Sequence, residues 1–326
     1  MSPFRRLRHA ALACLAATAL AAGAARAATP VRFVFDWATP DHELIPIVVA
    51  DANGYYKQAG LDVSVILPPD SQTTGRLLVS GRGDIGFEGT TDVAFAVEQG
   101  IPIVALAAFT QHNNWCLFGR PGEPVELDHL AGKSIAIYTD SWTKAMMPFV
   151  LRAAKLREDQ VKLVIATDED IPLLLAHKID IATNTSNYAV AQVQAAVHKD
   201  PTSLCAPAFG APDVPVWVYT AAKPWLASHG DIARKWLSAT REALIWSVAH
   251  PKEAVALFEK AYPAAAQHSY NLIGWETLMP EMRGKQGYFV QDGATWTALA
   301  EALKATGQIS TVHPADAYFT NAYLSP

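Results

Sequence analysis

Cysteine is scarce in this sequence, with three residues in 326. One of them, Cys14, lies in an apolar N-terminal segment, which leaves Cys116 and Cys205 in the body of the chain. So few cysteines exclude a scaffold stabilised by many disulfides. The remaining two could form a single bridge in an oxidising compartment or stay as two buried thiols, and the sequence leaves both open.

An excess of basic residues is also missing. The chain has 26 lysines and arginines against 31 acidic residues, and four of the arginines lie within the first 27 positions. The remainder therefore has a net charge near −9. This excludes the basic surface with which proteins bind nucleic acids or anionic lipids.

After the N-terminus, no apolar run approaches the roughly 18 residues of a membrane span. Residues 1–27 have a basic cluster, an Ala/Leu-rich run and the ending Ala25-Arg26-Ala27. This pattern is typical of a secretory signal peptide. We expect cleavage near Ala27 and a soluble periplasmic protein, and we disfavour a lipoprotein because too little apolar sequence precedes Cys14. An exported chain has no access to a nucleotide pool, which disfavours kinases, NAD enzymes and DNA-binding proteins.

Motifs of catalysis and metal binding are absent as well. The sequence has no G-x-S-x-G elbow, no H-E-x-x-H pair and no Cys/His spacing typical of a metal site. Its ten histidines are dispersed. We therefore predict no catalytic residue, no metal and no cofactor. A secreted hydrolase is the distant alternative, which a turnover assay on generic esters or amides would test.

What the sequence does contain is a regular alternation of strands and helices. Strands are predicted at 31–35, 61–67, 84–87 and 101–106, with helices at 40–58, 74–80 and 90–99 between them. Pro46 must lie in the first turn of its helix, so that helix should begin near residues 43–45. The order predicts an α/β fold with a largely parallel sheet.

The alternation begins again after the Gly/Pro-rich residues 119–124. Strands are predicted at 134–138, 162–165 and 179–182, and helices at 141–156, 170–177 and 188–198. From Trp217 onward the chain is predicted to be mostly helical, at 230–249, 251–261 and 296–306.

Roughly 300 residues exceed what one core usually supports. We predict one discontinuous lobe, 28–118 with 216–326, and an inserted lobe, 119–215. Two crossing segments make a hinge, and a small ligand would bind in the cleft between the lobes.

Five short motifs, in order, carry a family resemblance. They are Asp36-Trp37 with Pro40 and His42, then residues 54–63 (GYYKQAGLDV), residues 80–86 (SGRGDIG), residues 99–102 (QGIP) and residues 130–133 (LAGK), with a helix around residues 250–254 (HPKEA). The chain resembles the periplasmic solute-binding proteins of ABC importers, within the group that binds thiamine pyrimidine precursors and aliphatic sulfonates. The resemblance covers nearly the whole chain after residue 27 and implies a two-lobed, type II-like periplasmic binding fold.

The resemblance implies capture of a small heteroaromatic molecule, such as a thiamine pyrimidine precursor, and delivery to an inner-membrane permease by a monomer. The alternative is a binder of a small organic anion such as an aliphatic sulfonate or taurine. A related branch, thiamine pyrimidine synthase, uses a Cys-rich segment, a pyridoxal phosphate lysine and a sacrificial histidine. With two scattered cysteines this chain fits that branch poorly, so we do not expect an enzyme.

Candidate ligand-binding residues follow the predicted strands, because ligands bind at the carboxyl ends of strands in open α/β sheets. They are Asp36, Trp37, His42, Glu88, Thr90 and Thr91 in the first lobe, and Ser141, Trp142, Thr143, Asn187 and Tyr188 in the inserted lobe. Each has a structural alternative. Trp37 could be a core aromatic, and Asp36, His42 and the threonines could cap helices.

The two tryptophans, Trp37 and Trp142, could sandwich a planar ring. Pyrimidine-binding relatives tend to have an acidic residue where this chain has Asn187-Tyr188, so either Glu88 supplies the carboxylate from the other lobe or the ligand is not an aminopyrimidine. Segments 36–42, 88–92 and 184–188 contain no arginine or lysine. This favours a planar heteroaromatic ligand over a simple sulfonate.

Overall fold

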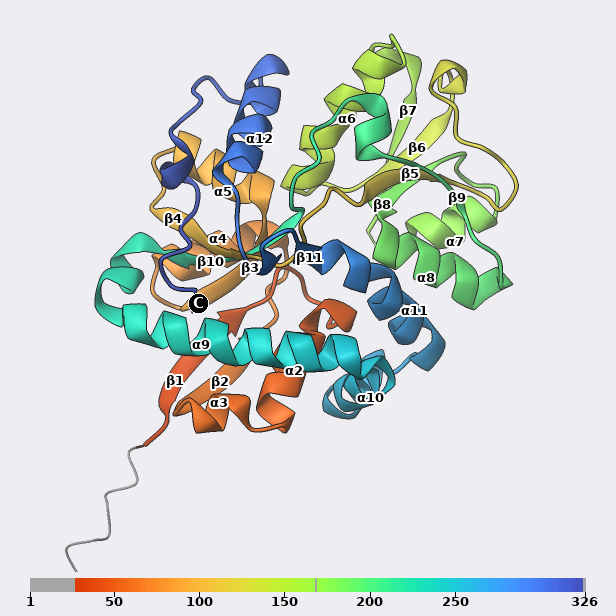
Figure 1. Ribbon diagram of the computed structural model, residues 1–326. Helices are drawn as coiled ribbons and strands as arrows, with labels where there is room; N and C mark the ends of the chain where they lie inside the picture. The colour runs from red at the N-terminus through yellow and green to blue at the C-terminus, as the bar shows by residue number, and fades with distance from the viewer. Residues whose placement is uncertain (1–26, 168, 325–326) are drawn as a thin grey trace, which may run out of the picture.

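The computed structural model describes residues 27–167 and 169–324, so the predicted signal peptide lies, except for Ala27, outside the described residues. Figure 1 shows two halves of the molecule, each with its own strands. We call them the first half, built on the sheet with β1, and the second half, built around β5 to β9. The α/β prediction is confirmed.

The first sheet has the strand order β2-β1-β3-β10-β4. Its strands are β1 (Thr29–Val34), β2 (Leu61–Ile66), β3 (Ile85–Gly89), β4 (Ile103–Ala108) and β10 (Trp217–Ala222). β2 and β3 both pair with β1 in parallel, whereas β10 lies antiparallel between β3 and β4. The largely parallel sheet is therefore confirmed, with one antiparallel strand in it.

Strand β10 corrects the prediction that the chain is mostly helical from Trp217 on. Five of its six residues are buried, so burial does not alternate along it. A short buried segment without alternation cannot be assigned to strand or helix by periodicity. The helix that follows, α9 (Lys223–Ala249), has Pro224 in its first turn, which marks the end of the strand.

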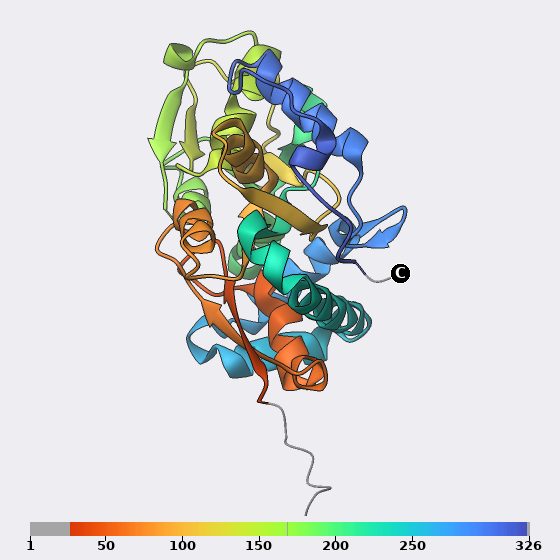
Figure 2. The ribbon, with the colours of Figure 1, turned by 90° about the vertical axis from the view of Figure 1, so that its left-hand side faces the viewer.

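Helices cover both faces of the first sheet. They are α2 (Ile45–Ala52), α3 (Tyr55–Gln58), α4 (Ser71–Val79), α5 (Thr90–Glu98), α9 and α10 (Pro251–Ala261). Helix α9 packs along α2 (Figures 1 and 2) and buries Trp236 against Phe33 of β1. On the opposite face Leu78 of α4 packs against Val34.

The single helix predicted at 40–58 is divided into three. A 3₁₀-helix, η1 (His42–Leu44), precedes α2, and Gly54 separates α2 from α3. Gly54 has φ +76°, a left-handed conformation that glycine adopts without strain. Pro46 lies in the first turn of α2, as predicted.

The second half contains two small sheets. Strands β8 (Ala182–Thr185), β5 (Trp115–Gly119) and β9 (Thr202–Cys205) form an antiparallel sheet, and β6 (Ser134–Ile137) pairs in parallel with β7 (Lys162–Ile165). Its helices are α6 (Ser141–Ala153), α7 (Asp170–Leu175) and α8 (Ser186–Val197).

Strand β5 was not predicted, and it bears on the boundary between the lobes. It pairs with β8 and β9 of the second half, although residues up to 118 are predicted to belong to the first lobe; the boundary at 119 stays a prediction. All five of its residues are buried, which again removes the alternation that would have revealed it. Cys116 lies opposite Cys205 in β9, and the two form a disulfide. Of the two alternatives left open by the sequence, a disulfide and two free thiols, the structure has the disulfide.

The C-terminal segments join the two halves. Helix α11 (His268–Leu278), which was not predicted, packs against α8 of the second half (Figure 1). Helix α12 (Gly293–Ala305) buries Trp296 and Leu303 in an apolar cluster that also includes Val93 of α5 and Trp142 of α6. The contact between the halves is therefore a packed interior on this side.

The remaining elements are short. They are the hairpin β11 (Arg283–Gly284) and β12 (Gly287–Tyr288), and the 3₁₀-helices η2 (Leu127–His129), η3 (Glu158–Gln160), η4 (Ala206–Phe209), η5 (Pro263–Ala265), η6 (Met279–Met282) and η7 (Ala315–Ala317). Among the described residues, no helix has the length and apolar character needed to cross a membrane.

Candidate functional site

Two of the predicted site segments lie at the carboxyl ends of neighbouring parallel strands. Phe33 and Val34 of β1 pair with Ile85 and Gly86 of β3. Continuing this register by two residues places Asp36 beside Glu88. Both side chains are buried. The sheet therefore brings these two predicted carboxylates together.

The first contact between the halves joins the N-termini of α5 and α6. Thr91 and Ser141 share a hydrogen bond of 2.7 Å between their hydroxyls. Their chain neighbours are Asp92, which accepts from the Gly89 amide at 3.1 Å, and Asp140, which caps α6 by accepting from the Thr143 amide at 2.7 Å. Two predicted residues thus meet across the junction, and each lies next to a carboxylate that the prediction did not include.

The second contact joins α8 to η1. The amide nitrogen of Asn187 donates to His42 Nε2 at 2.9 Å and to Glu43 Oε1 at 3.0 Å. The amide oxygen of Asn187 accepts from Asn114 at 3.0 Å. Tyr188, the next residue, donates its hydroxyl to Asp41. Three of the residues predicted at opposite sides of the cleft, His42, Asn187 and Tyr188, therefore lie together.

His42 is a neutral histidine in this arrangement. Complete burial lowers its pKa to about 3. Because an amide nitrogen only donates, His42 accepts at Nε2 and carries its proton on Nδ1. That buried Nδ1 has no hydrogen-bond partner. An unpaired buried donor is costly, and a ligand acceptor would remove the cost.

Gly274 of α11 allows the His42 ring to sit where it does. A Cβ at this position would lie 2.6 to 2.9 Å from three atoms of the ring. The ring cannot move away easily, because Tyr188 and Tyr270 pack around it with centroid distances of 5.1 and 5.6 Å.

We expect Gly274→Ala to lower the free energy of unfolding by about 1–3 kcal/mol through overpacking, although alanine is the better helix former. Urea denaturation of the variant measures the loss. Combining it with His42→Ala should recover part of the loss, because the clashing ring is then gone. Strictly additive costs of the two substitutions would contradict the assigned contact.

An aromatic group surrounds Trp37. Its ring lies 4.4 Å from Phe35, 5.2 Å from Trp217 and 6.1 Å from Tyr188, measured between centroids. Its indole nitrogen donates to Asp41 at 2.6 Å. Trp37 is only partly buried, whereas Trp142 is buried in the apolar cluster that also contains Val93 and Trp296, with its indole nitrogen unpaired. The ring that faces Trp37 from the second half is therefore Tyr188.

Two of the predicted residues have structural contacts. The Thr90 hydroxyl donates to the carbonyl of Pro215 at 2.6 Å, and the Thr143 backbone amide is part of the cap of α6. Both side chains are buried. Gly89 is the N-cap of α5, so the Thr90 hydroxyl does not cap that helix and instead ties it to the Pro215 carbonyl.

The carboxylates at the junction have raised pKa values. Burial raises the pKa of Glu88 to about 8, that of Asp41 to about 7 and that of Asp92 to about 6. Burial also holds the pKa values of Asp36 and Glu43 well above their ordinary range, with added repulsion from neighbouring carboxylates. Neutral donors oppose the shift at Asp41, Glu43, Glu88 and Asp92: the hydroxyls of Tyr188, Thr220 and Ser141 and the amide of Asn187.

Sequence reasoning missed several members of the site: Asp41, Glu43, Asp92, Asn114 and Trp217. Asp41 caps η1 by accepting from the Glu43 amide at 2.8 Å. An Asp before a helix is a common cap, and only the contact with Tyr188 distinguishes this one. Glu43 and Asp92 directly follow the predicted residues His42 and Thr91, whereas Asn114 directly precedes β5 and Trp217 begins β10, two strands that were not predicted.

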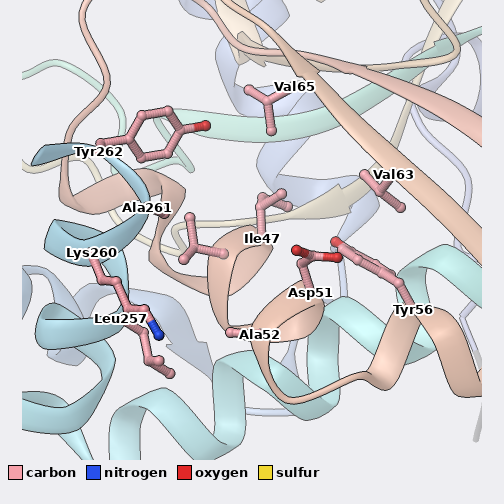
Figure 3. A pocket seen from close by; sticks show the side chains of 11 residues that line it. Ile47, Asp51, Ala52, Tyr56, Val63, Val65, Leu257, Lys260, Ala261 and Tyr262 are labelled. Atoms are coloured by element: carbon pink, nitrogen blue, oxygen red, sulfur yellow. The ribbon is translucent and has the colours of Figure 1, made fainter.

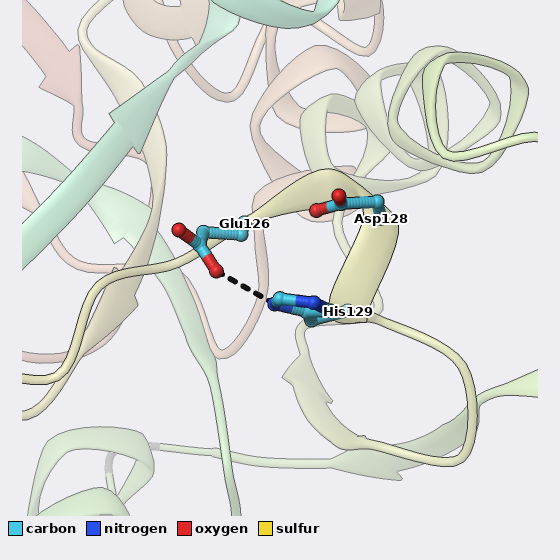
Figure 4. Close-up of side chains that lie close together, drawn as sticks. All are labelled: Glu126, Asp128 and His129. Atoms are coloured by element: carbon cyan, nitrogen blue, oxygen red, sulfur yellow. Dashed lines mark hydrogen bonds and ion pairs between the residues drawn. The ribbon is translucent and has the colours of Figure 1, made fainter.

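Two further features lie away from this junction. A cavity of about 380 Å³ is lined by residues of α2, α3, β2 and α10, including Asp51, Tyr56 and Lys260, and by none of the predicted site residues (Figure 3). In the second half, Glu126, Asp128 and His129 lie close enough together to hold a metal ion, and His129 pairs with Glu126 at 2.6 Å (Figure 4). All three are exposed, and the ion pair accounts for their closeness.

Solved structures with a similar chain path include periplasmic binding proteins. The alkanesulfonate-binding protein SsuA of Xanthomonas axonopodis pv. citri, bound to MOPS, has 12% identity and a TM-score of 0.67, with 90% of this chain and 99% of that chain covered. The periplasmic aliphatic sulphonate binding protein SsuA of Escherichia coli has 14% identity and a TM-score of 0.65, covering 88% and 91%. The predicted periplasmic-binding-protein fold is confirmed.

The names of relatives found by sequence do not refer to sulfonates. A Haemophilus influenzae protein whose name refers to thiamine biosynthesis is 22% identical over 282 residues, 86% of this chain and 88% of that protein. The riboflavin-binding protein RibY of Chloroflexus aurantiacus is 23% identical over 297 residues, 87% and 83%. The 4-amino-5-hydroxymethyl-2-methylpyrimidine phosphate synthase of Candida albicans is 22% identical over 254 residues, 72% and 71%. Residues 41–254 match the model of one family, and the chain therefore belongs to the NMT1/THI5-like family.

Proposed function

We propose that this chain is the periplasmic solute-binding component of an ABC importer, and that it captures a planar heteroaromatic molecule bearing amine groups, such as a thiamine pyrimidine precursor. The observation that carries the proposal is the junction between the halves. There the aromatic rings of Trp37 and Tyr188 lie next to buried carboxylates, one of which, Asp36, has an unpaired oxygen.

The chemistry of the junction favours a ligand that donates hydrogen bonds. Its buried groups include the carboxylates Asp36, Asp41 and Glu43, and the unpaired atoms Asp36 Oδ1 and Glu43 Oε2 are acceptors. Ring and exocyclic amino groups of a heteroaromatic would donate to such atoms, while a partly exposed indole supplies a flat apolar face.

A sulfonate ligand is disfavoured by the same charges. A buried anion needs donors or cations around it. Buried carboxylates at this junction, Asp36, Asp41, Glu43 and Glu88, would repel an anion, and the segments 36–42, 88–92 and 184–188 contain no arginine or lysine that would neutralise one. The names of the structural neighbours therefore do not decide the ligand of this chain.

We propose a binding role rather than a catalytic one. Some relatives are named as pyrimidine synthases, and the resemblance to that branch implies a Cys-rich segment. Here both cysteines in the body of the chain are held in a disulfide. A turnover assay on generic esters or amides addresses the hydrolase alternative.

Ligand affinity and closure of the two halves would be linked. The contacts Thr91–Ser141 and Asn187–His42 connect the halves directly, and they would have to separate for a ligand to enter. A ligand that contacts both sides then shifts the population toward the closed form. The closed form would be presented by a monomer to an inner-membrane permease.

We expect calorimetry to detect binding of 4-amino-5-hydroxymethyl-2-methylpyrimidine or a related planar heteroaromatic, and weak or no binding of ethanesulfonate or taurine. The physical reason is the acceptor-rich junction. Tight binding of ethanesulfonate without any response to the pyrimidine would contradict the proposal.

A further inference from the structure

Four carboxylates from both halves lie near one another at the junction. Asp36 and Glu88 lie at the ends of adjacent strands, and the hydrogen bond between Thr91 and Ser141 brings together their neighbours Asp92 and Asp140. We call these four residues, Asp36, Glu88, Asp92 and Asp140, the acidic cluster. The negative charge of the other three raises the pKa of Asp36, as does the charge of Glu43.

The acidic cluster has neutral hydrogen-bond partners rather than a counter-ion. Glu88 accepts from Thr220 and Asp92 from Ser141 and the Gly89 amide. By contrast, Asp84 at the start of β3 is also buried but is paired with Arg32, at 2.7 and 2.9 Å. Within the described part of the chain, burial and neighbouring carboxylates both raise the pKa of Asp36.

Two observations beyond the charges point to a ligand at this place. Asp36 is only 3% exposed, yet its Oδ1 has no hydrogen-bond partner. Glu43 Oε2, in a buried side chain on η1, is unpaired as well. Buried polar groups are usually paired, so two unpaired carboxylate oxygens at one junction indicate that a donor is missing.

We propose that the ligand carries a positive charge, and that its charged group binds beside Asp36 within the acidic cluster. This proposal rests on the proposed function and narrows it to cationic heteroaromatics, such as those bearing a protonated aminomethyl group. A cation there would be neutralised by carboxylates from both halves, so its charge would also hold the halves together.

The spacing of the carboxylates favours an organic cation over a metal ion. A metal ion needs several ligand atoms close together. Among the described residues, three side chains have ligand atoms within 4.8 Å of one another: Glu126, Asp128 and His129. The four residues of the acidic cluster do not form such a group.

Binding of a cation should release protons. A carboxyl group with a raised pKa holds a proton in the empty closed form and loses it as the pH rises through that pKa. A bound cation stabilises the ionised form, so protons leave as it binds. With pKa values of about 6 for Asp92 and about 8 for Glu88, affinity for the cation should fall as the pH is lowered from 8 to 6.

The test uses two probes that differ in one group. One is 4-amino-5-hydroxymethyl-2-methylpyrimidine, which is neutral, and the other is its 5-aminomethyl counterpart, in which an ammonium replaces the hydroxyl. We expect calorimetry to show about 10- to 100-fold tighter binding of the ammonium compound, the range for a charge-assisted hydrogen bond. Repeating the titration in two buffers of different ionisation enthalpy should show net proton release.

The variant Asp36→Asn keeps the shape of the side chain and removes its charge. It should reduce the preference for the ammonium probe to a few-fold while changing the affinity for the neutral probe less. The matched control is Asp84→Asn, which removes a buried carboxylate of the same half that already has a counter-ion. Both affinities should stay unchanged in that control.

Each outcome decides the proposal. Tighter ammonium binding with proton release, lost in Asp36→Asn, supports it. Equal affinity for the two probes, or no proton release in the unsubstituted protein, overturns the cationic ligand and leaves the heteroaromatic-binding function standing. If neither pyrimidine binds, the proposed function fails, and this inference fails with it. Should Asp36→Asn not fold, the probe pair and the buffer comparison still decide.

Discussion

Trp37→Ala is expected to weaken binding of the pyrimidine ligand by about 30- to 1,000-fold, a loss of about 2–4 kcal/mol. Truncation removes a partly exposed ring surface that the ligand would cover. It also removes the indole N–H that donates to Asp41 at 2.6 Å, and Asp41 is the acceptor of the Tyr188 hydroxyl from the second half. The substitution thus affects both stacking and the contact between the halves.

Two further variants separate these effects. Trp37→Phe retains a flat ring but lacks the N–H, so it should lose less affinity than the alanine variant. Trp225→Ala removes another partly buried tryptophan of the same half, one stacked on His229 at 5.0 Å. That control should lower stability without changing affinity.

The alternative for Trp37 is a purely structural role, since it packs against Phe35 and Trp217. In that case Trp37→Ala would lower the melting temperature strongly, and the affinity of the folded fraction would be unchanged. Measuring the melting temperature and the dissociation constant on the same preparation distinguishes the two roles. Unchanged affinity would remove Trp37 from the site.

Reduction of the disulfide between Cys116 and Cys205 is expected to lower the free energy of unfolding by about 4 kcal/mol. The bridge joins residues 89 positions apart, and cross-linking such a long loop restricts the unfolded chain considerably. The bridge also links β5 to β9 two residues after Asn114, whose amide donates to Asn187 at 3.0 Å. The second half should therefore be the part most affected.

Urea denaturation of the oxidised and the reduced protein gives the cleanest comparison, because the amino-acid composition is identical. The double variant Cys116→Ala with Cys205→Ala is the matched genetic control and should behave like the reduced protein. Cys116 is fully buried, so a small packing loss adds to the effect in that variant. Equal stability of the oxidised and reduced forms would show that the bridge contributes little.

Local sequence patterns were sufficient for much of the first half. Alternating or apolar runs separated by glycine and proline predicted β1 to β4 and the helices between them. Position at a strand end predicted Asp36 and Glu88, because parallel strands bring their carboxyl ends to one edge of the sheet. The start of α2 was predicted from Pro46, whose fixed φ and missing N–H restrict it to a first turn.

The two buried strands β5 and β10 were not predicted from local sequence patterns. Both β5 and β10 are short apolar runs, and a run that is buried on both faces has no periodicity to distinguish strand from helix. Their partners are also remote in sequence, since β10 inserts between β3 and β4 and β5 pairs with β8 and β9. Neither the antiparallel strand in the first sheet nor the disulfide could be deduced from local pattern.

The sequence by itself thus determined the fold class, most of the elements of the first half and the candidate residues at strand ends. Only the tertiary structure decided which of those residues meet. The contacts of Asn187 with His42 and of Tyr188 with Asp41 each join positions more than 140 residues apart. Tyr188 rather than Trp142 faces Trp37, and helix α8, which carries Tyr188, packs against α11. The physical reason is that strand, helix and cap preferences act over a few residues, whereas burial and charge at a site depend on segments that folding brings together.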